Sequence, residues 1–252
     1  MSTAIEPVSP THDEEDELAE LGLAPHSRVI RIPAYVRDFE SFRDWTASPE
    51  FPDFGRISWI GDEIEIDMNA ENIEFHNSVK TCLLVSLGLL IDAEDRGQYF
   101  GDGVRLVHVP TRLSCEPDFV FCSWAAFQTG RVGYQTGAKN TTETIELQGT
   151  PDLVVEVVSP SSITKDKRKH PQEYFAAGIP EYWIVDARKK EIDFRILVAG
   201  QTEYSESERD NAGFAASRVF QRGFRLSRTR NQVGNWKYLL EHQSTGAAPA
   251  DG

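Results

Sequence analysis

The chain has 252 residues, of which 40% are hydrophobic and 26% are charged. This is enough for a sizeable core and excludes a peptide-sized or disulfide-stapled scaffold. Its 40 acidic and 26 basic side chains give a formal net charge of −14, which argues against a nucleic-acid coat protein held by a diffuse basic surface but leaves a local basic groove open. The three cysteines, Cys82, Cys115 and Cys122, form no CxxC pair, so neither a disulfide framework nor a zinc ribbon is predicted.

Acidic residues are concentrated near the amino terminus, where residues 1–25 hold seven acids and no Lys or Arg. We therefore expect residues 1–27 to be an acidic disordered arm, residues 28–240 to form one domain and residues 241–252 to be a disordered tail. The sequence has no secretory signal, and no apolar run approaches the length of a membrane span. We expect a soluble cytoplasmic protein with no membrane partner.

The first elements predicted are a short strand at residues 29–36 and a helical turn at residues 39–46. In residues 57–68 (ISWIGDEIEIDM) apolar and acidic residues alternate after a Gly-Asp break. This pattern predicts a hairpin with one buried apolar face and one solvent-exposed acidic face. Residues 73–92 predict a long helix, and its second half is apolar nearly all round, so we expect it to be buried.

Five further runs predict strands, at residues 104–109, 118–122, 152–158, 182–186 and 192–198. Between the third and fourth runs, residues 171–177 predict a helix that ends at Gly178 and Pro180. A long helix and a strand–helix–strand unit among strands indicate an α/β class with a mixed central sheet flanked by helices and an additional N-terminal hairpin.

Glu156 lies inside LVVEVV (153–158), a run that is typical of a strand buried on both faces. A lone carboxylate there would cost several kcal/mol unless it is paired or binds a cation. A structural ion pair would meet this need, and so would a metal site.

Two neighbouring features favour the metal site. Asp118 opens the DFVFC strand, and a basic cluster at residues 165–169 (KDKRK) follows the Glu156 strand. Two carboxylates at adjacent strand ends and a lysine are the minimal set for metal-assisted phosphodiester hydrolysis. The carboxylates hold Mg²⁺, the metal lowers the pKa of a bound water, and the ammonium orients that water or stabilises developing charge.

A resemblance to a known family runs from about residue 57 to residue 198. The segments that carry it are LSCEPDFVF (113–121), ELQGTPDLVVEVVSPSSITKDK (146–167) and YFAAGIPEYWIVDARKK (174–190), joined by HNSVKTCLLVSLGLL (76–90) and FGDGVRL (100–106). They resemble the Uma-type family of restriction endonucleases, a branch of the PD-(D/E)xK nuclease superfamily.

This resemblance implies a restriction-endonuclease-like fold for residues 28–240. It also implies a metal-dependent DNA endonuclease, a hydrolase that uses Mg²⁺ or Mn²⁺ and a Mg-activated water. DNA is the implied partner, and a homodimer is common in nucleases that cut both strands.

The resemblance also assigns acidic residues by position. Pro117-Asp118 matches the PD motif, and Glu156 matches the acid of the (D/E)xK motif. A further upstream acid is usual in the superfamily, and Glu74 is the implied residue, with Glu71 as the alternative and His76 as an assisting group. The implied metal ligands are therefore Asp118, Glu156 and Glu74.

The lysine departs from the family pattern. Val158 stands where an ExK motif would have its lysine, and His170 stands where many relatives carry a lysine in the following helix. A subgroup has Lys-Asp after its Ser-Ser turn, which matches Lys165 here. The resemblance therefore implies Lys165 as the catalytic lysine, with Lys167 and Lys169 as less favoured alternatives.

The missing ExK spacing and His170 also support a different class of function. In that alternative the chain is a catalytically inactive nuclease-fold protein that acts as a nucleic-acid or protein-binding module. Residues 216–237 hold several Arg and Lys but no acid, with Phe220 and Phe224 among them, and we interpret them as a candidate phosphate-contacting surface.

Overall fold

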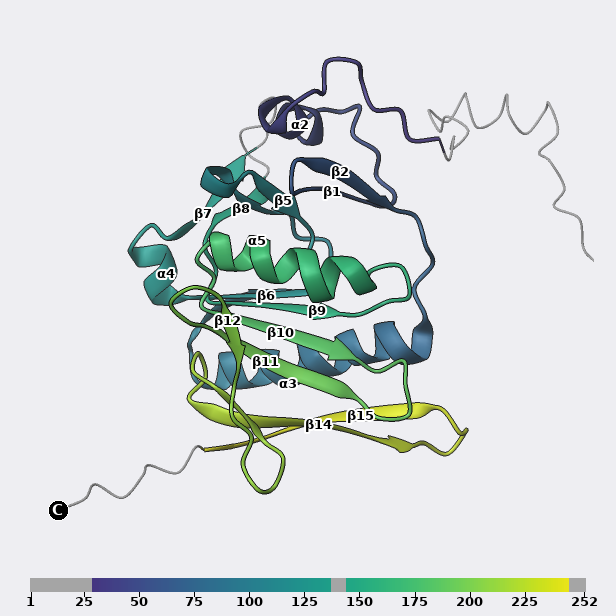
Figure 1. Ribbon diagram of the computed structural model, residues 1–252, viewed down its shortest axis with the longest axis vertical. Coiled ribbons are helices and arrows are strands. Elements are labelled where there is room, and N and C mark those ends of the chain that lie inside the picture. The colour runs from purple at the N-terminus through teal and green to yellow at the C-terminus, as the bar shows by residue number, and fades with distance from the viewer. Residues whose placement is uncertain (1–28, 137–143, 245–252) are drawn as a thin grey trace, which may run out of the picture. The chain divides into compact units, whose positions relative to one another are not determined.

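The computed structural model describes residues 29–136 and 144–244 (Figure 1). The chain divides into two compact units, Met1–Val36 and Arg37–Gly252. The predicted acidic arm and the end of the predicted tail lie outside the described residues.

In the first unit, the strand predicted for residues 29–36 is wrong, because this segment has a turn at Ala34 and Tyr35 and no strand. Pro33 has no N–H to give to a sheet ladder, which explains the difference.

The second unit has a mixed six-stranded sheet at its centre (Figure 1), which confirms the predicted α/β class. The spatial order of its strands is β12 (Tyr204–Glu206), β11 (Asp193–Ala199), β10 (Glu181–Asp186), β9 (Leu153–Val157), β6 (Phe119–Ser123) and β3 (Gly97–Phe100). Only the β9–β10 pair is parallel, and the other pairs are antiparallel. β9 lies between β6 and β10, so both of its edges are paired and its apolar residues are buried on both faces.

A second six-stranded sheet, which the sequence did not predict as a separate layer, contains the predicted hairpin. Its order is β2 (Glu63–Asp67), β1 (Arg56–Ile60), β5 (Leu113–Cys115), β4 (Leu106–His108), β8 (Thr144–Gly149) and β7 (Val132–Thr136). The hairpin turns at Gly61 and Asp62, which both have positive φ, as a two-residue turn that matches the twist of its strands requires.

A three-stranded antiparallel sheet completes the unit, with the order β13 (Ala215–Ser217), β14 (Arg222–Arg230) and β15 (Trp236–Ser244). β15 continues through residues 241–244, which the sequence had placed in the tail. These strands contain the late basic stretch, whose many arginines hid the strand pattern.

The helices with α geometry are α2 (Phe39–Thr46), α3 (Ser78–Ala93), α4 (Trp124–Gln128) and α5 (His170–Ala176). α3 and α5 are each preceded by a π-helical turn, Ile73–Asn77 and Lys165–Lys169 respectively, and a short 3-10 turn covers Val109–Thr111. None of the helices in the described ranges is long and apolar enough to cross a membrane.

Two hydrophobic cores lie on opposite faces of the central sheet. On one face, Val155 and Trp183 pack with α3 and the three-stranded sheet. On the other face, Val154 and Ile184 pack with α5 and the second sheet. Figure 1 shows α5 over one face and α3 over the other. Because side chains alternate along a strand, Glu156 faces the α5 side together with Val154.

The predicted burial of the second half of α3 against a sheet is confirmed for one side of the helix. The stripe Leu83, Leu87 and Ile91 is buried against the sheet, but Val85 is 54% exposed and Leu89 is 67% exposed. The sheet covers only one side of the helix, and apolar residues on the other side remain in contact with solvent.

Candidate functional site

Glu156 is the buried carboxylate at the centre of the candidate site. Its side chain on β9 points towards α5, where the hydroxyl of Tyr174 donates a hydrogen bond of 2.7 Å to Oε1. Nδ1 of His170 lies 3.1 Å from the same oxygen. Burial alone would raise the pKa of Glu156, but the charge of His170, assisted by that of Lys165, outweighs burial and lowers it.

Asp118 immediately precedes β6, which pairs with β9, so the two carboxylates come from neighbouring strands. The backbone N–H of Val157 donates a hydrogen bond of 2.7 Å to Oδ2 of Asp118. This bond ties the side chain of one strand to the backbone of the other. The sequence prediction that Asp118 and Glu156 belong to one site is therefore supported by strand pairing.

Electrostatics also place these two acids close together. Burial raises the pKa of Asp118, and the negative charge of Glu156 raises it further. Two cations lie beside Asp118, with Arg56 Nη1 at 3.2 Å and Lys80 Nζ at 3.6 Å from Oδ1. They lower its pKa but do not outweigh burial and Glu156.

Arg56 and Lys80 are shared with two further acids. Arg56 Nη2 lies 2.8 Å from Glu71 Oε1 and 2.6 Å from Asp102 Oδ1. Lys80 Nζ contacts Asp102 Oδ2 at 2.8 Å and also pairs with Glu71. We call Asp118 and these four residues the Asp118 cluster.

Sequence reasoning missed three members of the Asp118 cluster, namely Arg56, Lys80 and Asp102. A signal existed for Lys80, because it is the only Lys or Arg of the helical run 73–92 and lies four residues after His76, on the same face of a helix. Arg56 and Asp102 come from distant segments and had no comparable signal.

Of the two upstream acids that the sequence offered, the structure brings Glu71 to Asp118 and not Glu74. Glu71 Oε2 lies 3.5 Å from Nδ1 of His76, whose Nε2 lies 3.6 Å from Asp118 Oδ2. Glu74 Oε1 instead lies 3.9 Å from Arg230 Nη1 on β14. Glu74 lies within the π-helical turn Ile73–Asn77, whereas Glu71 precedes it, and turns of this kind are frequent at functional sites.

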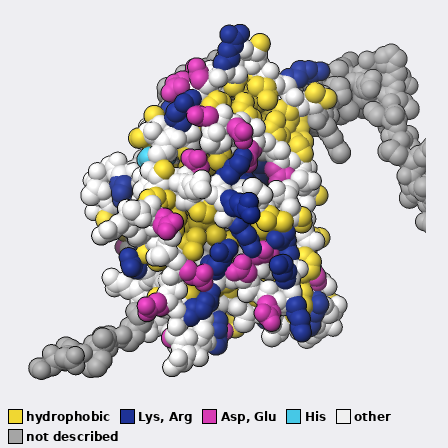
Figure 2. Space-filling view, in the orientation of Figure 1, with side chains coloured by type: hydrophobic (Ala, Val, Ile, Leu, Met, Phe, Trp, Pro, Cys, Tyr) yellow, Lys and Arg dark blue, Asp and Glu magenta, His cyan; other side chains and the backbone are white. Residues whose placement is uncertain are grey.

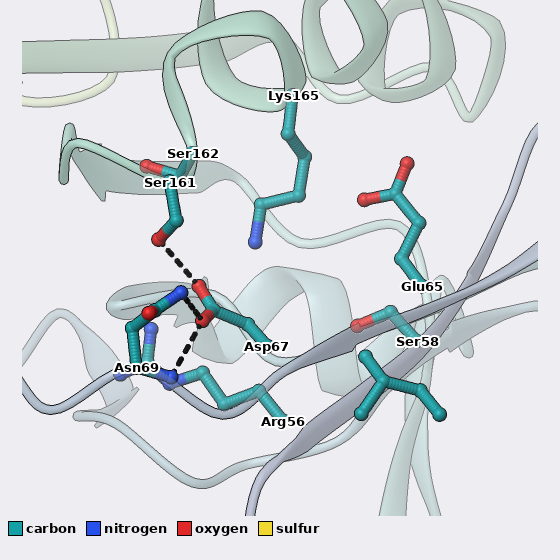
Figure 3. A pocket seen from close by; sticks show the side chains of 9 residues that line it. Arg56, Ser58, Glu65, Asp67, Asn69, Ser161, Ser162 and Lys165 are labelled. Atoms are coloured by element: carbon teal, nitrogen blue, oxygen red, sulfur yellow. Dashed lines mark hydrogen bonds between the residues drawn. The ribbon is translucent and has the colours of Figure 1, made fainter.

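Lys165 lines a pocket of about 130 Å³ beside the two carboxylates (Figure 3). It forms no ion pair with any described residue, and its ammonium group points into the pocket that Arg56 and Ser161 also line. Burial alone would lower the pKa of Lys165, but nearby carboxylates, of which Glu156 has the largest effect, outweigh burial and raise it.

The two alternative lysines, Lys167 and Lys169, do not line the pocket. Lys167 Nζ pairs with Asp186 at 2.7 Å, and Lys169 Nζ pairs with Glu65 at 2.6 Å. Each of these ammonium groups is committed to acids outside the Asp118 and Glu156 pair.

The predicted faces of the β1–β2 hairpin are reversed in β2. Ile66 and Met68 are exposed, whereas Glu65 and Asp67 line the pocket. Asp67 accepts a hydrogen bond of 2.9 Å from Ser161, as Figure 3 shows. β2 is the edge strand of its sheet, and its acidic face is turned towards the lysines of the 165–169 turn because they offer opposite charge.

The predicted basic surface at residues 216–237 is largely neutralised. Arg222 pairs with Glu94, Arg225 lies 3.1 Å from Glu241, and Arg230 stacks on Trp236. On the face drawn in Figure 2, Lys and Arg side chains alternate with Asp and Glu side chains. Intermingled charges of this kind do not make a basic groove.

The residues beside the pocket fit a divalent cation. Asp118 and Glu156 offer carboxylate oxygens, which are the ligands that Mg²⁺ and Mn²⁺ prefer. Their mutual repulsion raises the pKa of Asp118, and a cation between them would relieve it.

Comparison with known proteins gives a family and a similar fold. The Uma2 family model, described as "Putative restriction endonuclease", matches residues 39–229. Among curated proteins there is no significant match. The crystal structure of a putative nuclease belonging to DUF820 from Anabaena variabilis is similar in fold, with a TM-score of 0.53 and 13% identity, and the match covers 73% of this chain and 90% of that chain.

Proposed function

Because the chain belongs to the Uma2 family of putative restriction endonucleases, we propose that it is a metal-dependent endonuclease that hydrolyses DNA phosphodiester bonds. The observation that carries the proposal is the pair of buried carboxylates on neighbouring strands, Asp118 and Glu156, beside a pocket that holds an uncommitted ammonium group. Neighbouring acids that repel one another, next to a pocket lined by Lys165 and Arg56, are suited to binding a metal and a phosphate together.

Asp118 and Glu156 are the proposed ligands of Mg²⁺ or Mn²⁺. The bound cation would supply Lewis acidity, which makes water more acidic and offsets the charge of the phosphate. Glu71 replaces Glu74 as the proposed auxiliary acid, because Glu71 belongs to the Asp118 cluster. Arg56 and Lys80 hold Asp118 in place through its Oδ1.

Lys165 is the proposed catalytic lysine. Its raised pKa keeps the side chain protonated at neutral pH, so it donates hydrogen bonds and does not act as a general base. In the pocket it lies with Arg56, and together they present two positive groups to a phosphate. The ammonium of Lys165 orients the attacking water or stabilises the charge that develops on the phosphate oxygens.

Cleavage of supercoiled plasmid and of a short duplex in Mg²⁺ or Mn²⁺ tests this proposal. We expect Asp118→Asn, Glu156→Gln and Lys165→Met each to lower the cleavage rate by about 100-fold or more, because each removes a group that acts on the reacting phosphate. Lys167→Met is the matched control, since this lysine of the same turn pairs with Asp186, which does not line the pocket, and it should cleave at the wild-type rate. Intact DNA at every wild-type protein and metal concentration would refute the proposal.

A second candidate function is a binding module without catalysis. It is favoured by Asp118, whose Oδ1 already lies beside two cations, and by His170 at the position of the family's lysine. This candidate predicts that the wild-type protein retains short duplex DNA in a gel-shift assay without cutting it. It also predicts that calorimetry detects no Mn²⁺ uptake that depends on Asp118.

A further inference from the structure

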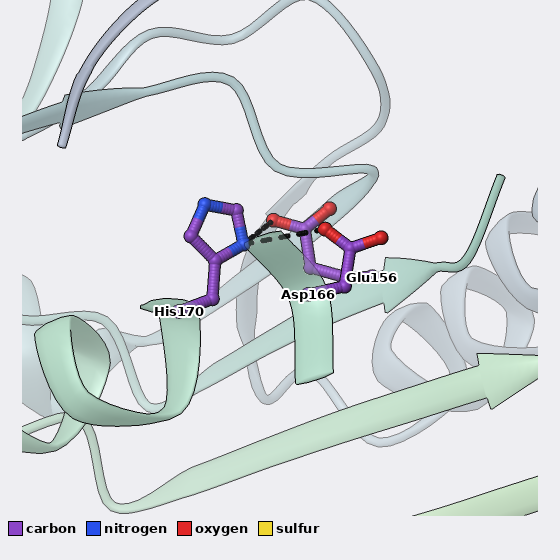
Figure 4. Close-up of side chains that lie close together, drawn as sticks. All are labelled: Glu156, Asp166 and His170. Atoms are coloured by element: carbon purple, nitrogen blue, oxygen red, sulfur yellow. Dashed lines mark ion pairs between the residues drawn. The ribbon is translucent and has the colours of Figure 1, made fainter. Parts of the chain in front are cut away.

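A second cluster of ligand-type side chains lies on the α5 side of Glu156. It consists of Glu156, Asp166 and His170, which we call the buried triad (Figure 4). Glu156 is 3% exposed, and Asp166 and His170 are each 1% exposed. Asp166 and His170 are four residues apart, so the π-helical turn and the start of α5 present both to the same strand.

The ligand atoms of the buried triad converge. Nδ1 of His170 lies 3.1 Å from Oε1 of Glu156 and 3.6 Å from Oδ1 of Asp166, and Figure 4 shows the ring nitrogen facing both carboxylates. One oxygen of each acid and a ring nitrogen all lie within 4.8 Å of one another. Two unit-charge ligands and one neutral ligand at these separations are typical of a cation site.

Several of these atoms have no satisfactory partner. Oδ1 of Asp166 and both ring nitrogens of His170 are buried and have no hydrogen bond of acceptable geometry with any described residue. Buried polar atoms are rarely left in this state, because each unsatisfied group costs about 1–3 kcal/mol. Convergence and lack of partners are independent observations, and both indicate a missing ligand.

We propose that the buried triad binds one transition-metal ion of the Zn²⁺ or Mn²⁺ type, through Glu156, Asp166 and His170. In tetrahedral coordination with bonds of about 2.0–2.1 Å, neighbouring ligand atoms are about 3.3 Å apart, and the observed 3.1 and 3.6 Å lie on either side of that value. The imidazole nitrogen selects against Mg²⁺ and Ca²⁺, which take oxygen ligands.

Surrounding hydrogen bonds orient the two acids as outer-shell partners do in metal sites. Ser162 Oγ donates to Oδ2 of Asp166 and leaves Oδ1 turned towards His170. The hydroxyl of Tyr182 donates to the backbone carbonyl of Asp166 at 2.8 Å, which fixes the turn. Ser162 also lines the pocket, so the triad lies next to the pocket wall.

The charge balance supports a cation here. Two buried carboxylates, Glu156 and Asp166, converge here, and a divalent ion between them would offset their charge.

The inference goes beyond the proposed nuclease function, because the triad can bind a metal whether or not the protein cleaves DNA. The two proposals share Glu156 but differ in their remaining ligands. Asp118 belongs to the nuclease proposal alone, and Asp166 and His170 belong to the triad alone. Variants of these three residues therefore test the two proposals separately.

Titration of the metal-free, full-length protein with Co²⁺ and with Zn²⁺ tests the triad. We expect one equivalent of Co²⁺ to give visible d–d absorption, and Zn²⁺ to compete for the same site in calorimetry. His170→Lys and Asp166→Asn should each weaken Zn²⁺ binding by more than the roughly 10–100-fold that the loss of an outer-shell partner costs. His170→Lys places a cation between the two acids and should keep the fold intact, and circular dichroism verifies this for both variants.

Two further variants serve as controls. Asp118→Asn and His76→Gln change residues that lie near the triad but do not belong to it, and both variants should keep the Co²⁺ absorption of the wild type. The proposal is overturned if folded His170→Lys or Asp166→Asn protein retains wild-type Zn²⁺ affinity, or if Asp118→Asn or His76→Gln abolishes the absorption. Failure of the wild-type protein to cleave DNA while it still binds Co²⁺ would count against the nuclease proposal alone.

Discussion

Buried carboxylates in this protein differ in how fully they are paired. Asp186 is held by Arg188, which reaches both of its oxygens at 2.8 Å, and by Lys167. Burial alone would raise the pKa of Asp186, but these hydrogen bonds outweigh burial and lower it. The pKa values of Asp118 and Asp166 shift in the opposite direction, because burial and the charge of Glu156 together raise them. Raised pKa values at neighbouring carboxylates are often found at functional sites.

Asp186→Asn should lower the free energy of unfolding by about 2 kcal/mol at pH 7, the typical contribution of hydrogen bonds to a charged group. The folded-state pKa of Asp186 is lower than the unfolded-state value. Its contribution is therefore complete above the unfolded pKa of about 3.9 and is lost as the pH falls through the folded pKa. Urea unfolding of the wild type and of Asp186→Asn between pH 7 and pH 3 should show a difference in unfolding free energy that shrinks below about pH 4. A difference that grows on acidification would contradict this.

At the scale of single residues, the sequence predicted Asp118 and Glu156 as a pair, because both stand at recognisable places in strand patterns. It could not predict Arg56 or Asp102, because these residues reach Asp118 only after separate segments of the chain have packed together. His170 was noticed as a departure from the family pattern. Its position against Asp166 required the π-helical turn, which no residue pattern in the sequence indicated.

At the scale of elements, a buried carboxylate adds hydrogen bonds to the apolar contacts between the three-stranded sheet and the central sheet. The carboxylate of Glu181 on β10 accepts hydrogen bonds from Trp183, from Ser217 on β13, and from the backbone N–H groups of Arg218 and Val219. Four donors on one carboxylate offset the cost of its burial. This contact connects two sheets whose strands are distant in the sequence.

Glu181→Ala should lower the free energy of unfolding by about 2–4 kcal/mol, because it leaves buried donors without an acceptor. Hydrogen exchange should show the loss of protection first in β13 and β14. Glu191→Ala is the matched control, since Glu191 is exposed, and it should change the stability by no more than about 0.5 kcal/mol. Equal effects of the two substitutions would show that Glu181 does not anchor the sheet.

The apolar strands β9 and β10 were predicted correctly, whereas β14, whose composition is mixed, was not predicted as a strand. β9 and β10 are continuous apolar segments, so their pattern was clear. β14 (RGFRLSRTR) alternates arginines with apolar residues, and its basic character suggested a binding surface when it is mostly a paired strand. In β2 the alternation was recognised, but the exposed face could not be assigned, because that depends on which sheet edge the hairpin occupies.

For the whole molecule, the distribution of charge matters more than the total of −14. Residues 1–25 contribute seven negative charges, and subtracting −7 from −14 leaves −7 for the rest of the chain. The late arginines are largely paired with acids or stacked on rings, so they add little free positive potential. Any DNA affinity therefore depends on the cations of the pocket and on screening by salt.

Removal of residues 1–25 should strengthen binding of a short DNA duplex at low ionic strength, because it removes repulsion between like charges. The gain should fade between about 0.05 and 0.5 M salt as the Debye length shortens. Fluorescence anisotropy with a labelled duplex measures the DNA affinity of the full-length and the truncated protein across this range of salt concentration. Equal affinity of the two forms at low salt would show that the acidic segment does not repel DNA.

The hydrogen bond between Asp118 and the N–H of Val157 also has a consequence for the order of folding. It joins residues 39 positions apart, and the Arg56 contact with Asp118 spans 62 positions. Non-local contacts of this kind form late, because long loops must close before the contacts stabilise them. During synthesis the hydrogen bond from Val157 to Asp118 therefore cannot form until β9 has left the ribosome, after every residue of the Asp118 cluster has already been made.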